Sequence, residues 1–251
     1  MRRLADGARQ IGIPLSPSTL RTFQTYRDEL LEWNQRFNLT AVRDAEQIEI
    51  RHFLDSLTCL LALREIDGAQ KSRGAPSFSP DAAISALDVG SGAGFPGLPL
   101  KIVWPALRLT LLEATGKKAR FLEHIVARLG LADVTVVNGR AEEVAHDAAH
   151  REAYDLVMAR AVAELPELVE YTLPFARRGG WVLAPKGSTA HAEALAAETA
   201  LRRLGGRPYR LLPVEVPGLA ETRYIILIEK VAATPPGFPR RPGVPHKHPL
   251  W

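Results

Sequence analysis

The spacing of hydrophobic residues changes once along the chain, close to residue 82. Before that point, apolar residues recur three or four positions apart between charged ones, first over 18–37 and again over 46–63. Ser16 and Ser18 are typical helix N-caps, and Pro17 suits the first turn of a helix. Residues 1–66 are therefore predicted to form a helical extension.

A different pattern follows a segment rich in Gly, Ser and Pro. This segment, 67–81, has no periodicity and is predicted to be a flexible linker. From 82 to 231, short apolar runs alternate with helical stretches. The strand-like runs are Ala83–Val89, Leu107–Glu113, Val134–Asn138, Asp155–Ala159, Trp181–Ala184, Arg210–Val216 and Tyr224–Glu229. The helical stretches lie near Gly97–Trp104, Lys117–Leu129, Glu164–Phe175 and Ala190–Leu204.

This alternation predicts an α/β domain with a mostly parallel, seven-stranded, Rossmann-like sheet that carries helices on both faces. The last two strand-like runs are separated only by Pro217–Thr222, which favours an antiparallel hairpin. The remaining residues, 232–251, are rich in proline and contain no carboxylate. We expect them to form an extended basic tail.

The composition excludes several classes of protein. The chain has 251 residues, and no apolar run approaches the length that a membrane span needs. The N-terminus lacks the apolar block of a signal peptide. Cys59, the only cysteine, allows no internal disulfide and is predicted to be a core residue. We expect a cytoplasmic monomer without a metal site. The net charge of +4 is compatible with an RNA partner.

A glycine-rich turn follows the first strand-like run. Gly90, Gly92, Gly94 and Gly97 lie between that run and a helix, which is the setting of a nucleotide-binding turn. The last three of these glycines also fit the spacing of an NAD site. Asp88, at the end of the strand, favours S-adenosylmethionine, because a carboxylate can accept from the ammonium of a methionine moiety but would repel a pyrophosphate.

Acidic residues also follow the next two strands. Glu113 ends the second strand, where a carboxylate can accept from both ribose hydroxyls of a cofactor. Ala141 and Glu142 come soon after the third strand, on a loop that faces the adenine edge in such folds. Alternatively, Glu113 and Glu142 are acids at helix starts, favoured by the helix dipole.

Two basic residues follow later strands. Arg160 comes at the carboxyl end of a central strand, where its planar guanidinium can hold guanine O6 or a phosphate. The alternative is an ion pair at the end of the strand, for which Glu142 is a candidate partner. Lys186 follows the fifth strand and is predicted to contact RNA at the rim of the cleft, unless it is a solvated turn lysine.

Several blocks of the sequence resemble one known family. The blocks are Phe37–Ala41, His52–Leu57, LDVGSGAGFPGLPLKIVWP and Arg240–Pro245. They resemble the small-subunit ribosomal RNA methyltransferase G family, also called glucose-inhibited division protein B. The resemblance implies a class I methyltransferase that transfers a methyl group from S-adenosylmethionine to N7 of a guanine in 16S ribosomal RNA, at position 527. Its partner would be 16S ribosomal RNA or the small ribosomal subunit.

The resemblance also implies roles for individual residues. The cofactor contacts that it implies are Gly90, Phe95, Glu113, Ala114, Thr115, Ala141, Glu142 and Arg160. Asp88 and Gly92 are added to them from the glycine-rich turn itself. The substrate or RNA contacts would be Asn38, His52, Arg160, Lys186, Arg240 and Arg241, with Lys247 adding charge to the tail. Asn38 and Asp55 are also plausible helix caps. No residue is predicted as a general acid or base, since guanine N7 already carries a lone pair at neutral pH.

Three alternatives remain open from the sequence. A class I methyltransferase of a small molecule or a protein would share the same turn. An NAD-dependent dehydrogenase would use Gly92, Gly94 and Gly97. A non-catalytic RNA-binding module is disfavoured, because it would give Asp88 and Glu113 no purpose at the ends of two strands.

Overall fold

The computed structural model describes residues 1–70, 78–79 and 81–251. Its first part is helical, as predicted. The elements are α1 (Arg2–Gln10), α2 (Pro17–Phe37), α3 (Ala45–Ile48), the π-helix η1 (Glu49–Leu54), α4 (Asp55–Leu57) and α5 (Cys59–Gln70). Ser16 caps α2, because its hydroxyl accepts from the Thr19 N–H at 3.1 Å. Helix α1 was not predicted, although Leu4 and Ala8 bury one of its faces at a spacing of four.

Two boundaries differ from the prediction. The second helical stretch is not one helix, because the N–H of Asp55 reaches back to the carbonyl of Ile50 and widens the turn between α3 and α4 into a π-helix. Helix α5 continues to Gln70, so the predicted linker does not begin at residue 67. The rest of that predicted linker lies largely outside the described residues.

Seven strands form one sheet in the order β3-β2-β1-β4-β5-β7-β6. They are β1 (Ser85–Val89), β2 (Arg108–Glu113), β3 (Val134–Asn138), β4 (Tyr154–Met158), β5 (Ala176–Lys186), β6 (Gly206–Val214) and β7 (Arg223–Lys230). Strands β1 to β5 are parallel, and β7 is antiparallel to both β5 and β6. The predicted sheet and its closing hairpin are confirmed. The carboxyl ends of β1 to β5 therefore meet at one edge.

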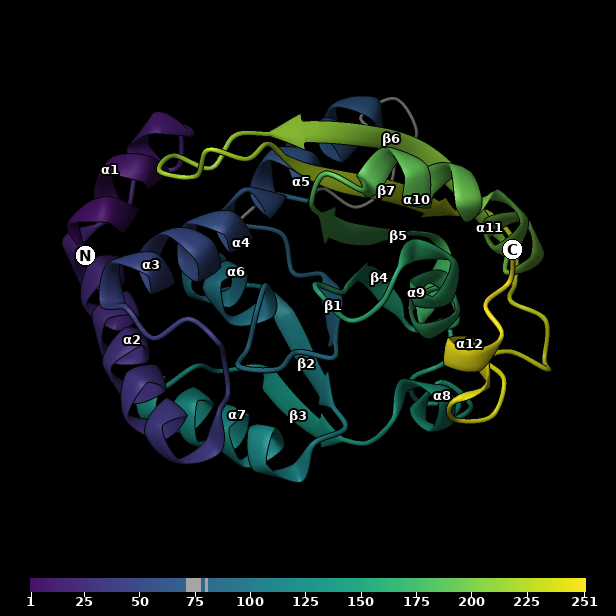
Figure 1. The fold of residues 1–251 in the computed structure, drawn as a ribbon, viewed down its shortest axis with the longest axis horizontal. Coiled ribbons are helices and arrows are strands. Elements are labelled where there is room, and N and C mark those ends of the chain that lie inside the picture. The colour runs from purple at the N-terminus through teal and green to yellow at the C-terminus, as the bar shows by residue number, and fades with distance from the viewer. Residues whose placement is uncertain (71–77, 80) are drawn as a thin grey trace.

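Helices cover both faces of the sheet (Figure 1). They are α6 (Gly97–Val103) and α7 (Gly116–Leu129) on one face, and α8 (Ala141–Val144), α9 (Leu165–Thr172), α10 (Ala190–Ala196) and α11 (Glu198–Arg203) on the other. Alternate residues of β1 divide between the two cores, with Ala86 in one and Leu87 in the other. Leu4 and Phe53 share the Ala86 core, so the N-terminal helices pack directly on the α/β domain.

The C-terminal tail is not simply extended. It lies beside α8 and α9 and ends in a short helix, α12 (Val244–Lys247) (Figure 1). Arg151 binds the tail by donating to the carbonyls of Phe238 and Thr234, at 2.8 and 2.9 Å. The expectation of an extended tail came from its proline content. The structure shows instead that its carbonyl groups are held by side chains of the α/β domain.

Two further observations concern the described residues as a set. None of their helices combines the length and apolarity required to cross a membrane. They also contain no group of three or more His, Cys, Asp or Glu side chains that could hold a metal ion. Cys59 is fully buried in the core, as predicted.

Candidate functional site

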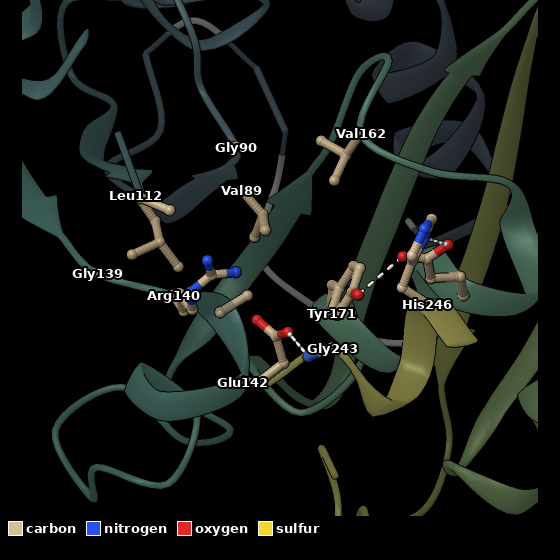
Figure 2. Close-up of a pocket in the computed structure, with 13 residues that line it drawn as sticks. Val89, Gly90, Leu112, Gly139, Arg140, Glu142, Val162, Tyr171, Gly243 and His246 are labelled. Carbon is tan, nitrogen blue, oxygen red and sulfur yellow. Dashed lines mark hydrogen bonds and ion pairs between the residues drawn. The ribbon is translucent and has the colours of Figure 1, made fainter. Parts of the chain in front are cut away.

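A pocket of about 330 Å³ opens at the carboxyl edge of β1, β2 and β3, and we call it the glycine-turn pocket. Its lining residues are Val89, Gly90, Leu112, Ala114, Gly139, Arg140, Ala141, Glu142, Val162, Glu167, Tyr171, Gly243 and His246. Leu112, Gly139 and Arg140 lie on one side of this pocket, and Tyr171 and His246 lie on the other (Figure 2). Four predicted cofactor residues line it: Gly90, Ala114, Ala141 and Glu142.

The glycine turn needs glycine at Gly90 for two reasons. Its φ of +67° is unfavourable for other residues, and a Cβ there would lie 2.7 Å from Cγ2 of Val162. The backbone of the turn therefore packs directly against the loop that follows β4. Val162 forms part of the pocket wall because of this close approach.

Asp88 does not have the position that its predicted role requires. It is fully buried beneath the turn, and its Oδ2 accepts from the Gly97 N–H at 2.8 Å, which fastens the start of α6 to β1. Burial raises its pKa to about 7, and Oδ1 is a buried atom without a hydrogen-bond partner among the described residues. Asp88 was predicted to accept from a cofactor ammonium directly or through water. The side chain does not line the pocket, because β1 directs it into the core, so the structure gives no support to the direct contact.

Glu113 joins the two loops that border the pocket. Its Oε2 accepts from the Gly92 N–H at 2.9 Å, and its Oε1 accepts from the Thr115 N–H at 2.7 Å. The side chain is buried, although none of these three residues lines the pocket. Each carboxylate oxygen has a second lone pair, so Glu113 can still accept from a ligand hydroxyl. Its structural role is to order the glycine turn.

The C-terminal tail closes the far side of the glycine-turn pocket. The Gly243 N–H donates to Oε1 of Glu142 at 3.1 Å. Nδ1 of His246 lies 3.3 Å from Oε2 of Glu167, whose Oε1 accepts from the Tyr171 hydroxyl at 2.8 Å (Figure 2). The buried setting of Tyr171 raises its pKa. Two carboxylates therefore connect the tail to α8 and α9 at the pocket.

A second pocket of about 350 Å³ lies beyond the ends of β4 and β5, and we call it the arginine pocket. Its lining residues are Val42, Arg51, His52, Asp55, Arg160, Ala161, Pro185, Lys186, Gly187 and Arg223. Three predicted substrate residues meet here: His52, Arg160 and Lys186. They come from η1, from the loop after β4 and from the end of β5.

Arg160 is fixed on several sides. Its Nη1 donates to Oδ2 of Asp55 at 2.7 Å and to the carbonyl of Arg51 at 3.3 Å. Its guanidinium also lies over the ring of Phe95, 5.1 Å from the centroid. The alternative, an ion pair at the end of the strand, is present, but its partner is Asp55 rather than Glu142. Phe95 is buried below this guanidinium and does not line the glycine-turn pocket.

His52 is held as a neutral imidazole. Burial, reinforced by the charge of Arg160, lowers its pKa to about 3. Its Nε2 lies 2.7 Å from the hydroxyl of Thr40, and its ring stacks on Phe95 with centroids 4.5 Å apart. The amide of Asn34 binds both the N–H and the carbonyl of Thr40, so helix α2 indirectly sets the position of His52.

Three predicted RNA contacts do not offer a free polar group to the arginine pocket in the way that was expected. The ammonium of Lys186 donates to the carbonyl of Ala163 and pairs with Glu193, both at 2.6 Å, and its side chain is only 8% exposed. Arg240 pairs with the fully buried Glu170. Asn38 ends α2 in a left-handed conformation, which agrees with its alternative role as a cap, and it lies outside the arginine pocket. Lys186 and Arg240 are therefore not free cations.

Sequence reasoning missed Arg51 and Arg223 in the arginine pocket. Arg223 begins β7, and its neighbour Tyr224 pairs with Lys186 at the end of β5. The predicted hairpin paired only the last two strand-like runs with each other, so it did not place the start of β7 beside the end of β5, and no signal pointed to Arg223. Tyr171 and His246 were also missed, because the packing of the tail on α9 has no sequence signature.

The loop after β4 lies between the two pockets. Arg160 and Ala161 line the arginine pocket, and Val162 lines the glycine-turn pocket. Ala161 has a φ of +56°, a conformation that few residues other than glycine adopt. This turn directs consecutive side chains toward different pockets. A ligand in each pocket would therefore contact the same short loop.

Comparison with known proteins agrees with this geometry. A family model described as rRNA small subunit methyltransferase G matches residues 19–216. The chain belongs to this family. A relative named ribosomal RNA small subunit methyltransferase G, from Roseiflexus castenholzii, is 51% identical over 239 residues and covers 95% of each chain. One of the same name from Dehalococcoides mccartyi is 46% identical over 250 residues and covers both chains fully.

Solved structures of lower sequence identity share the fold. A putative O-methyltransferase from Klebsiella pneumoniae is 17% identical, with a TM-score of 0.55 over 91% of this chain and 96% of that one. A mutant of MtNAS, in complex with S-adenosylmethionine, is 15% identical, with a TM-score of 0.54 over 84% of this chain and 73% of that one. The fold of this family member is thus a Rossmann-like methyltransferase fold.

Proposed function

We propose that this chain transfers the methyl group of S-adenosylmethionine to N7 of a guanine in 16S ribosomal RNA, in line and without a general base. Family membership supports the coarser statement, that the chain is an S-adenosylmethionine-dependent rRNA methyltransferase. It also disfavours the NAD-dependent dehydrogenase and the non-catalytic module. The position of the methylated atom and the mode of transfer are the finer parts of the proposal.

The glycine-turn pocket fits the proposed cofactor. Val89, Leu112 and Val162 offer apolar walls to a purine, and Glu142 places a carboxylate beside them. The absence of a side chain at Gly90 lets Val162 pack against the turn and form one of these walls. When bound, S-adenosylmethionine supplies an electrophilic methyl group on a sulfonium. The residues of this pocket bind and orient it.

The observation that carries the proposal is the shared wall between the pockets. Arg160 and Val162, two residues apart, line opposite sides of the loop after β4. A base held in the arginine pocket would lie next to the cofactor pocket. Rate enhancement would then come from holding donor and acceptor in a reactive orientation. We assign Arg160 to guanine O6, because a guanidinium is the usual partner of that edge of guanine.

The charges in the arginine pocket support transfer without a general base. The low pKa of His52, about 3, makes it a weak base. Asp55 is bound by the guanidinium of Arg160. Guanine N7 needs no deprotonation, since its lone pair is free at neutral pH. The pocket therefore orients the base rather than removing a proton.

The test is transfer of label from S-adenosylmethionine to small ribosomal subunits that lack the modification. Wild-type protein should label guanine N7. Arg160→Ala should abolish transfer while keeping the folded circular dichroism spectrum. Arg207→Ala is the matched control, since Arg207 is an exposed arginine on β6 that pairs with Glu229. Label on another atom, or full activity of Arg160→Ala, would refute the corresponding part of the proposal.

A further inference from the structure

Asp55 lies between Arg160 and Arg223, and its carboxylate is closer to the first guanidinium than to the second. Its Oδ2 accepts from Nη1 of Arg160 at 2.7 Å, whereas its Oδ1 lies 3.6 Å from Nε of Arg223. The first contact is a hydrogen bond, and the second is too long for one. Asp55 itself is buried, with a side chain 10% exposed. Arg160 is thus locked in place, while Arg223 is only attracted to the carboxylate.

Arg223 has an unused donor at the arginine pocket. Its Nε is one of three buried side-chain polar atoms without a hydrogen-bond partner among the described residues. A buried N–H without an acceptor is costly, so an acceptor that entered the pocket beside Arg223 would remove this cost. The side chain as a whole is 30% exposed and lines the pocket, although its Nε is itself buried from solvent.

The charge of the pocket indicates what kind of acceptor this is. The guanidinium groups of Arg51, Arg160 and Arg223 line it, against the single carboxylate of Asp55. Lys186 adds no net charge, because Glu193 neutralises it. The lining therefore has an excess of two positive charges, which an anion with several oxygen atoms would balance better than a neutral base edge.

We propose that Arg223 is a binding residue for a phosphodiester group of the RNA that enters the arginine pocket, and that Asp55 is its positioning residue. This inference rests on the proposed function, because it takes the occupant of the pocket to be RNA. It divides the pocket into two parts. Arg160, fixed by Asp55 and Phe95, faces the base, and Arg223 binds the backbone.

The salt dependence of RNA binding tests the proposal. A phosphate contact releases counterions, so its loss lowers the slope of log affinity against log salt by about 0.7 to 0.9. We would measure binding to unmodified small ribosomal subunits, without cofactor, for wild type and Arg223→Ala. The ratio of wild-type affinity to Arg223→Ala affinity should therefore fall about threefold as the salt concentration rises from roughly 50 to 200 mM.

Arg207→Ala is the control for removing a surface arginine. Arg207 lies opposite Glu229, at the other end of the β6–β7 ladder from Arg223, and its slope should equal that of wild type. Asp55→Asn tests positioning. It should lower the melting temperature, because it weakens a buried ion pair, and it should also raise KM for the subunits while leaving the KM for S-adenosylmethionine near wild type. Asp55→Glu should recover part of both losses.

The outcomes separate this inference from the proposed function. A wild-type slope for Arg223→Ala, with methylation intact in the wild type, would overturn the phosphate contact and leave the function standing. A reduced slope in a protein that methylates another atom would support the contact and refute guanine N7. If Asp55→Asn changes only thermal stability, Asp55 is a tether of the helical extension, and its positioning role is overturned.

Discussion

Removing the side chain of Arg240 should destabilise the protein strongly, although this residue lies in the C-terminal tail. Glu170 is fully buried, and its carboxylate accepts from Nε, Nη2 and the backbone N–H of Arg240 at 2.7 to 3.1 Å. Loss of one partner from a buried ion pair costs about 3 to 5 kcal/mol. The tail can move and let water reach Glu170, so we expect about 3 kcal/mol for Arg240→Ala.

Urea denaturation measures this effect as a lower midpoint at an unchanged slope. Arg241→Ala is the matched control, because Arg241 is the exposed neighbour, and it should remain within about 0.5 kcal/mol of wild type. Arg240→Met combined with Glu170→Leu should recover stability relative to Arg240→Ala, since apolar residues often replace a buried ion pair without loss.

The same substitution should weaken binding of S-adenosylmethionine. Gly243 and His246 line the glycine-turn pocket, and the Gly243 N–H donates to Glu142, so a detached tail removes one wall. A hydrogen bond to a charged group contributes about 1.5 kcal/mol or more, which corresponds to about a tenfold loss of affinity by calorimetry. If Arg240→Ala unfolds at the wild-type midpoint, the buried pair does not anchor the tail.

Three further predictions concern the pockets. Glu113→Ala should weaken S-adenosylmethionine binding at least about tenfold, because two backbone N–H groups of the loops that border the pocket lose their acceptor. Calorimetry measures this affinity, and an unchanged value would remove Glu113 from the site. The pKa of His52 is about 3 in the folded protein and about 6.5 in the unfolded chain. Between these two pKa values the unfolded chain binds more protons than the folded protein, so the free energy of unfolding decreases as the pH drops below about 6.5. His52→Gln should therefore lose less stability than wild type between pH 7 and 5 in urea titrations, and equal losses would contradict a buried neutral imidazole. In a thermal-shift assay, adenosylhomocysteine should raise the melting temperature and NAD should not; the reverse would restore the dehydrogenase alternative.

The fold could be predicted from the sequence because its strands and helices differ in hydrophobic period. The closing hairpin followed from the short segment between the last two strands, and the structure pairs β6 and β7 antiparallel. Helix α1 and the π-helix η1 were missed for physical reasons. A short amphipathic helix is stabilised by tertiary packing, and a π-turn depends on one backbone hydrogen bond rather than on a residue pattern.

The candidate site could be predicted only where backbone topology fixes it. Gly90, Ala141 and Glu142 follow strand ends and line the expected pocket. Asp88 also ends a strand, but the alternation of β1 directs its side chain into the core. Lys186 is neutralised by Glu193, which lies on a neighbouring helix. Such pairings form between distant segments, so spacing along the chain does not reveal them.

The most direct test is to identify the nucleotide that the wild-type protein modifies. Unmethylated small ribosomal subunits would be incubated with the protein and S-adenosylmethionine, and the 16S RNA would be digested and analysed by mass spectrometry. We predict one 7-methylguanosine, absent when Arg160→Ala replaces wild type. A methyl group on another base or another guanine atom, or on a ribosomal protein, would contradict the proposed function.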